Sequence, residues 1–133
     1  MIAEDEADIR NLVATMTQVW GHVPVTFESG HKAWEFLDQV EAGTYPDQLP
    51  DFALMDIRMP GHRGDEIAKR IRQIDSLKHI PIVLMTAFVL SDEEVNTMRN
   101  SNGVDLILHK PLPDFMELKG ILEQVIDDKQ RGE

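Results

Sequence analysis

The sequence predicts a single doubly wound α/β domain in which five parallel strands alternate with five helices. Uninterrupted apolar runs at residues 52–55, 82–85 and 106–108 are typical of parallel strands that are covered on both faces. The segments between them carry apolar residues three and four apart, which is the spacing of amphipathic helices. Because the two kinds of segment alternate strictly, we expect helices on both faces of a parallel sheet.

The first half of the chain predicts strands 1 and 2 and two helices. Residues 1–3 form a short strand, and apolar residues at positions 9, 12, 13, 16, 19 and 20 predict a helix that stops at Gly21. Alternating residues 23–27 predict an edge strand, in which Pro24 is tolerated because its missing N–H need not face a neighbour. A second helix carries apolar residues at 33, 36, 37 and 40, and a loop at 42–50 leads to the strand that ends at Asp56.

The second half predicts three more helices. Asp65 is expected to cap the first of them, which buries isoleucines at 67, 71 and 74 and exposes basic residues at 69, 70 and 72. Ser91 has the capping-box spacing to Glu94, and the helix it opens offers only Val95 and Met98 as large apolar residues. We therefore expect this helix to be weakly anchored. The last helix begins at Asp114 and buries residues 118, 121, 122, 125 and 126.

The predicted strand order places several polar residues at one edge of the sheet. Right-handed crossovers leave two common orders, and five strands fit the flavodoxin-like order 2-1-3-4-5 best. Strands 1 and 3 then flank the point where ligands bind in such sheets, so Glu4 and Asp5 are expected beside Asp56. Thr86 and Lys110 follow strands 4 and 5 and should reach the same edge.

This set of side chains predicts phosphoryl chemistry. Three carboxylates in one crevice repel each other, so they take up protons or hold a cation. Oxygen ligands without histidine or cysteine suit Mg²⁺. Asp56 can then act as a nucleophile on phosphorus, while Thr86 and Lys110 stabilise the phosphoryl oxygens. Each residue alone has an ordinary explanation, such as a turn cap or a surface lysine, but four of them at successive strand ends favour a site.

The composition limits the classes of partner. The chain has 133 residues, 42% of them hydrophobic, which suits one domain with its own core. With 24 acidic and 13 basic side chains the net charge is −11, so we expect no direct binding of nucleic acid or anionic membranes. The longest apolar stretch, residues 80–90, is far short of the ~20 residues that span a bilayer. There is no cysteine and no secretory signal, which favours a cytoplasmic protein.

The site residues resemble those of the receiver domain of two-component response regulators. The resemblance covers essentially the whole chain and lies in a set of motifs in family order: Glu4-Asp5, Asp56 with Met59-Pro60 and Gly64, Thr86-Ala87, and Lys110-Pro111. It assigns residues 1–128 to the domain and leaves residues 129–133 as a charged C-terminal tail.

The resemblance implies that Asp56 accepts a phosphoryl group from the phosphohistidine of a sensor histidine kinase or a phosphotransfer protein. Asp5 would bind Mg²⁺ directly, Glu4 through water, and Arg58 through its backbone carbonyl, together with Asp56. Such a domain catalyses only its own phosphorylation and dephosphorylation. It would signal to a downstream protein partner or a fused output domain, with a phosphorylation-linked homodimer as one form of output.

The resemblance also implies a cis Lys110–Pro111 bond that aims the lysine at the phosphoryl group.

The sequence departs from the family pattern at three positions. Ile107 stands three residues before this lysine, where the family often has an aromatic residue, so we expect the usual coupling of the threonine to an aromatic switch to be missing. Arg58 and Phe88 are larger than many residues found at their positions, and we expect them to change the lifetime of the phosphoryl group.

Two alternatives belong to other functional classes. A hydrolase of the haloacid dehalogenase type also uses an aspartate nucleophile and Mg²⁺, but it needs a second aspartate where this chain has Arg58. A degenerate receiver would bind partners without being phosphorylated. Against that reading, every residue of the acceptor site is present.

Overall fold

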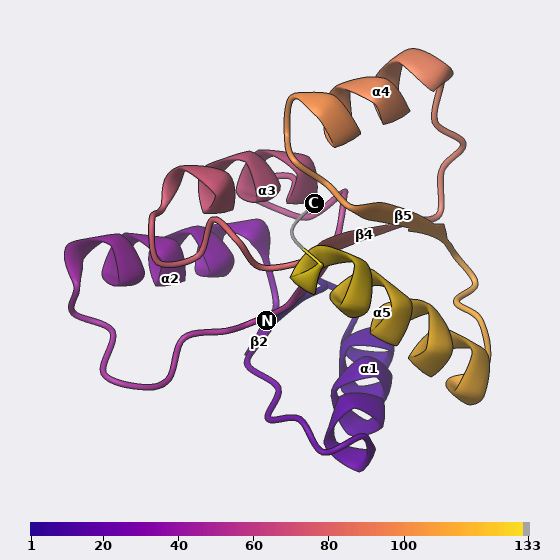
Figure 1. Ribbon diagram of the computed structural model, residues 1–133, viewed down its shortest axis with the longest axis horizontal. Helices are drawn as coiled ribbons and strands as arrows, with labels where there is room; N and C mark the ends of the chain where they lie inside the picture. The colour runs from indigo at the N-terminus through magenta and orange to yellow at the C-terminus, as the bar shows by residue number, and fades with distance from the viewer. Residues whose placement is uncertain (132–133) are drawn as a thin grey trace.

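Residues 1–131 of the computed structural model form a five-stranded parallel sheet with helices on both faces (Figure 1). The strand order is β2-β1-β3-β4-β5, which confirms the predicted fold. The strands are β1 (Ile2–Ala3), β2 (Thr26–Phe27), β3 (Ala53–Asp56), β4 (Ile82–Thr86) and β5 (Leu106–His109). The helices are α1 (Ala7–Val19), α2 (Gly30–Ala42), α3 (Gly64–Gln73), α4 (Asp92–Asn100) and α5 (Phe115–Gln130). None of these helices has the length and apolar content needed to cross a bilayer.

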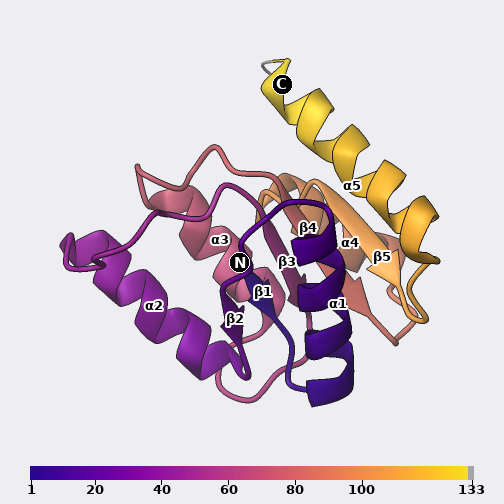
Figure 2. The same cartoon turned by 90° about the horizontal axis from the view of Figure 1, so that it is seen from below.

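The central strand β3 is buried on both faces, as its apolar sequence predicts. Ala53 and Met55 pack into the cluster that includes α2 and α3, whereas Leu54 packs into the cluster of α1 and α5. Figure 2 shows these two helix pairs on opposite sides of the sheet. Each fully buried leucine or methionine contributes roughly 1.5–3 kcal/mol through the hydrophobic effect. This double cover holds the end of β3, and with it Asp56, in a fixed position.

The edge strands are less buried than the sequence predicted. Residues 106–108 of β5 are only partly buried, because no strand pairs with its outer side and the helices of the described chain cover it incompletely. On the other edge, β2 is limited to two residues, and Val23 lies outside it with 90% of its surface exposed. An apolar run shows that a segment is a strand but does not show its place in the sheet.

The start of α3 also differs from the prediction. The N-cap is Arg63 rather than Asp65, and Asp65 lies in the first turn, where it accepts a hydrogen bond from Arg63 Nε at 3.0 Å. Gly64 begins the helix because a Cβ at this position would collide with the backbone carbonyl of Asp56. The close approach of the helix to β3, rather than capping preference, therefore sets where α3 begins.

The basic residues of α3 do not form a single solvated face. Arg70 Nη2 lies 2.7 Å from Asp38 and 3.0 Å from Glu41, and its guanidinium carbon lies 4.6 Å from the ring centroid of Trp34. These three partners all belong to α2, so Arg70 joins α2 to α3. The prediction of a solvated face was wrong here because α2 packs alongside this part of α3.

Arg72 joins α3 to the segment between α4 and β5. Its guanidinium donates to the Gly103 carbonyl at 2.7 and 3.0 Å, to the Ile80 carbonyl at 2.6 Å and to Asp105 at 2.9 Å. Nearby, Asn102 Nδ2 donates to the carbonyl of Asp65 at 2.9 Å. The chain immediately after α4 is therefore fixed to α3.

The last two helices begin as predicted. Ser91 and Glu94 form a reciprocal capping box at α4, where Met98 is buried, and Asp114 accepts a hydrogen bond from the Glu117 N–H at 2.9 Å at the start of α5. Helix α5 continues to Gln130, so the first two residues of the expected tail are helical, while residues 132–133 lie outside the described residues. Lys129 Nζ lies 3.1 Å from Asp105 and ties the end of α5 to the start of β5.

Candidate functional site

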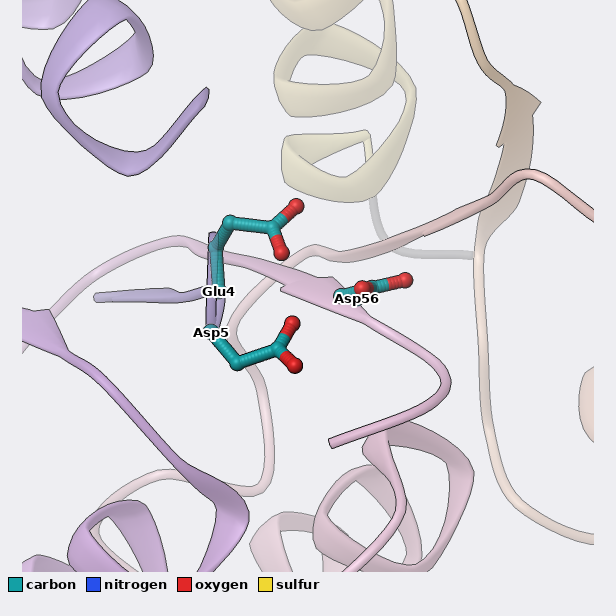
Figure 3. Close-up of side chains that lie close together, drawn as sticks. All are labelled: Glu4, Asp5 and Asp56. Atoms are coloured by element: carbon teal, nitrogen blue, oxygen red, sulfur yellow. The ribbon is translucent and has the colours of Figure 1, made fainter. Parts of the chain in front are cut away.

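Three carboxylates meet at the carboxyl edge of the sheet, as the strand order predicted. Glu4 and Asp5 follow β1, Asp56 ends β3, and Ala3 is paired with Met55 in the register of the two strands. Figure 3 shows the three side chains close together, with the Glu4 and Asp5 carboxylates on the side of Asp56. One oxygen from each residue lies within 4.8 Å of the other two.

Lys110 compensates two of these carboxylates. Its Nζ lies 2.7 Å from Glu4 Oε1 and 3.3 Å from Asp56 Oδ2. Glu4 is 0% exposed and Asp56 is 7% exposed, so burying either carboxylate without a charged partner would be costly. Burial lowers the pKa of Lys110, but the hydrogen bond to Glu4 and the charges of Asp56 and Glu4 outweigh it and raise this pKa above its ordinary value. The lysine is therefore held in its charged form.

Asp5 is the member of the cluster that faces solvent. Partial loss of hydration, followed by a hydrogen bond with Glu4, raises the pKa of Asp5 above its ordinary value, although Lys110 opposes the effect. Three carboxyl groups thus share one ammonium, which leaves an excess of acidic groups. A divalent cation bound by oxygen ligands would relieve this excess, and Mg²⁺ suits such a set. The residues present therefore fit a magnesium site.

Thr86 lies at the adjacent strand end. Asp56 is paired with Met85 in the register of β3 and β4, so Thr86 is the next residue along β4. Its side chain is buried, its Oγ1 accepts a hydrogen bond from the Phe88 N–H at 3.0 Å, and its carbonyl accepts one from the Lys110 N–H at 2.7 Å. The second of these bonds fixes the lysine next to the end of β4.

Four further residues support the site through contacts that the sequence did not predict. Arg10 Nη1 donates to the carbonyl of Glu4 at 2.8 Å and holds the acidic loop against α1. Gly64 admits the backbone of Asp56, as described above. The guanidinium carbon of Arg58 lies 3.8 Å from the ring centroid of Phe88, so a contact joins the loops that follow β3 and β4. The only sequence feature that could have indicated the contact of Arg10 is its position near the start of the helix that follows Glu4 and Asp5.

The structure thus brings together Glu4, Asp5, Asp56 and Lys110 and places Thr86 at the next strand end. The expected cis bond between Lys110 and Pro111 is present. A sequence model described as the response regulator receiver domain matches residues 1–123. The chain belongs to this family.

Receiver domains act in two-component signalling, where they interact with histidine kinases and downstream partners, and they are in general not enzymes. The chain is 28% identical over 119 residues to the polar-differentiation response regulator DivK of Brucella anthropi, covering 88% of this chain and 89% of that protein. The DivK protein of Brucella ovis matches with the same identity and coverage.

Solved structures of receiver domains share the fold. A CheY-like receiver domain protein from Methanospirillum hungatei superposes with a TM-score of 0.78 at 17% identity, covering 99% of this chain and 95% of that one. The chemotaxis response regulator CheY4 of Vibrio cholerae gives a TM-score of 0.75 at 23% identity, with 93% and 94% coverage. At these identities the likeness establishes the fold alone.

Proposed function

We propose that this receiver domain accepts a phosphoryl group on Asp56 from the phosphohistidine of a sensor histidine kinase or a phosphotransfer protein. The observation that carries the proposal is the position of Asp56, which contacts Lys110 and lies beside two further carboxylates. Glu4 also contacts the lysine, but it is completely buried, and no contact between Asp5 and the lysine side chain is found in the described chain. Among the three carboxylates, Asp56 is the one that contacts the lysine without being completely buried.

The residues divide the chemistry among them. Bound Mg²⁺ would supply charge neutralisation at the phosphoryl oxygens, with Asp5, Asp56 and the backbone carbonyl of Arg58 as direct ligands and Glu4 as a ligand through water. An oxygen of Asp56 forms a bond to phosphorus while the bond from phosphorus to the donor imidazole nitrogen breaks, and that nitrogen leaves with the bonding electron pair.

Lys110 and Thr86 stabilise the group that has been transferred. The ammonium of Lys110 already lies 3.3 Å from Asp56, where it can bind a phosphoryl oxygen, and the hydroxyl of Thr86 can donate to another. The same two groups can promote loss of the phosphoryl group from Asp56 to water. Both reactions take place on the domain's own aspartate, so the domain acts only on itself. This chemistry is the self-phosphorylation and self-dephosphorylation expected of a receiver.

The proposal extends to signalling partners. We infer a cytoplasmic protein that passes its phosphorylation state to a downstream protein or a fused output domain, including through a phosphorylation-linked homodimer. The net charge of −11 argues against nucleic acid as the direct target of this domain. Membership of the receiver family counts against a hydrolase of the haloacid dehalogenase type.

Intact-protein mass spectrometry after incubation with acetyl phosphate and Mg²⁺ tests the proposal. The wild-type chain should gain one phosphoryl group, and Asp56→Asn should gain none. Asp51→Asn is the matched control, because Asp51 is an exposed aspartate on the same segment at the opposite end of β3. Labelling of Asp56→Asn would refute the assignment of the acceptor. A wild-type protein that is never labelled would instead favour a phosphorylation-independent interaction module.

A further inference from the structure

The contact between Arg58 and Phe88 lies beside the acceptor site and has no role in the chemistry described so far. Arg58 is two residues after Asp56, and Phe88 is two residues after Thr86. The guanidinium carbon lies 3.8 Å from the ring centroid, which is a cation–π geometry. In the described part of the chain Arg58 forms no ion pair, whereas Arg63 in the same loop pairs with Asp65 at 3.0 Å. The charge of Arg58 is thus held by the aromatic ring alone.

The backbone of Phe88 is coupled to Thr86. The Phe88 N–H donates to Thr86 Oγ1 at 3.0 Å, so the rotamer of the threonine supports the loop that carries the ring. Among residues 1–131 the Thr86 hydroxyl accepts this hydrogen bond and is not found to donate one. A phosphoryl oxygen on Asp56 would provide a charged acceptor for it, and a hydrogen bond to a charged group is stronger than one between neutral groups. If the Thr86 side chain rotates so that Oγ1 moves toward that oxygen, the Phe88 N–H loses its acceptor. The ring of Phe88 is then free to shift.

Arg58 has better partners than the ring once a phosphoryl group is present. A guanidinium can form two parallel hydrogen bonds to phosphoryl oxygens, and such pairs are stronger than an exposed cation–π contact. Phe88 is itself 47% exposed, so the contact that holds Arg58 is at the weak end of its range. An exchange of partners is therefore favourable for Arg58.

From this geometry, and resting on the proposed function of Asp56, we propose that Arg58 is a further ligand of the phosphoryl group. In the unphosphorylated protein the ring of Phe88 binds the Arg58 guanidinium and keeps it from the site. Phosphorylation turns Thr86, displaces the ring and transfers the guanidinium from the ring to the phosphoryl oxygens. The residue that would otherwise connect the threonine to the surface, the aromatic residue at position 107, is absent here. The pair of Arg58 and Phe88 would instead connect Thr86 to the surface through the loop that follows β4.

The charge of Arg58 also acts on the first turn of α4. The pKa of Glu94 is lowered mainly by its hydrogen bonds with Ser91, and the positive charges of Arg63 and Arg58 lower it further. Moving the guanidinium toward Asp56 removes part of this positive field from the start of α4.

Side-chain NMR of Arg58 provides a direct readout. In the free wild-type protein the ring current of Phe88 should shift the Arg58 Nε–Hε signal upfield, and Phe88→Leu should abolish that shift. Addition of beryllofluoride with Mg²⁺ to the wild-type protein should move the signal close to its position in Phe88→Leu. A signal that keeps its ring-current shift in the mimic-bound protein would refute the proposal.

A double-mutant cycle measures the coupling through the affinity for beryllofluoride at 0.15 M salt. Phe88→Leu should lower the apparent Kd about two- to fivefold, the range of an exposed cation–π contact, because the guanidinium is no longer held back. Phe88→Tyr should restore the wild-type value, since it keeps the ring. Arg58→Gln should raise the Kd about tenfold, and in that background Phe88→Leu should have no further effect.

Arg63→Gln is the matched control, because it removes the same charge from the same loop without touching Phe88. Its effect should stay below about twofold at this salt concentration, where exposed charges are screened. If Phe88→Leu has the same effect with and without Arg58, the coupling does not exist and this inference fails. If the wild-type protein does not bind beryllofluoride, the proposed function fails instead.

Discussion

Replacement of Lys110 by methionine should destabilise the domain in the absence of Mg²⁺. Methionine keeps the length of the side chain and removes its charge. Glu4 and Asp56, 0% and 7% exposed, would then lie beside each other without the ammonium that bridges them at 2.7 and 3.3 Å. Loss of one partner from a buried ion pair costs about 3–5 kcal/mol. Because the crevice is open to water at Asp5, we expect the lower end, about 3 kcal/mol.

Urea unfolding followed by the fluorescence of Trp20 and Trp34 measures this loss. With an m-value of about 2 kcal/mol/M, a loss of about 3 kcal/mol lowers the midpoint by about 1.5 M. Mg²⁺ should recover part of the deficit, because a cation that binds only the folded state stabilises it and no longer competes with the ammonium. Lys69→Met, which removes an exposed lysine from α3, is the control and should shift the midpoint little.

The pH dependence provides a second check. The pKa of Lys110 is raised in the folded state, so its contribution is fully present below the unfolded pKa of about 10.5 and is lost as the pH rises through the folded value. The difference between wild type and Lys110→Met should therefore persist at pH 8 to 9 and shrink only at strongly alkaline pH. Equal midpoints for Lys110→Met, Lys69→Met and wild type at pH 7 without Mg²⁺ would refute the reasoning.

Three further predictions concern the site and its surroundings. Asp5→Asn should stabilise the Mg²⁺-free protein and weaken Mg²⁺ binding. Because the pKa of Asp5 is raised in the folded state, the stability of the wild-type protein falls as the pH rises from the unfolded to the folded pKa of this group. Urea midpoints at pH 4 and pH 7 should therefore show a smaller fall in the variant than in the wild type. Gly64→Ala should lose about 1–3 kcal/mol of unfolding free energy through its clash with a backbone carbonyl, whereas Gly120→Ala, where a Cβ meets open space in the described structure, should gain up to about 1 kcal/mol. Beryllofluoride with Mg²⁺ should shift NMR signals of residues 87–103 strongly and the Ile107 methyl signals little, and a rotamer change at Ile107 with an unperturbed α4 would contradict this.

The fold could be predicted because its determinants are local and repetitive. Four apolar residues in a row at 52–55 leave few alternatives to a central parallel strand. The handedness of crossovers then leaves two common strand orders, and the number of strands selects one of them. What the sequence could not show was the relative cover of each strand. The partial burial of β5 depends on how closely α4 and α5 pack on it, and this is decided by contacts between distant segments.

The candidate site could be predicted to the level of its strand ends and no further. Strand order brings Lys110 to three carboxylates, but side-chain positions decide that it contacts Glu4 most closely. Arginine is the hardest residue to interpret from sequence, because its long side chain reaches partners on other elements. Arg58, Arg70 and Arg72 contact an aromatic ring, a neighbouring helix and backbone carbonyls, and none of these contacts has a signal in the local sequence.

The attachment of the chain after α4 has a mechanical consequence. Hydrogen bonds from Arg72 to Gly103 and from Asn102 to Asp65 hold the far end of α4, while the near end begins just beyond the loop that carries Phe88. Because the C-terminal end of α4 is fixed, a displacement that starts at the Phe88 loop should move the first turn of the helix farther than its last turn. If Asp56 is phosphorylated as proposed, we expect a partner that contacts the first turn of α4 to distinguish the phosphorylated domain from the unphosphorylated one. A partner that contacts only the last turn should bind both forms equally well.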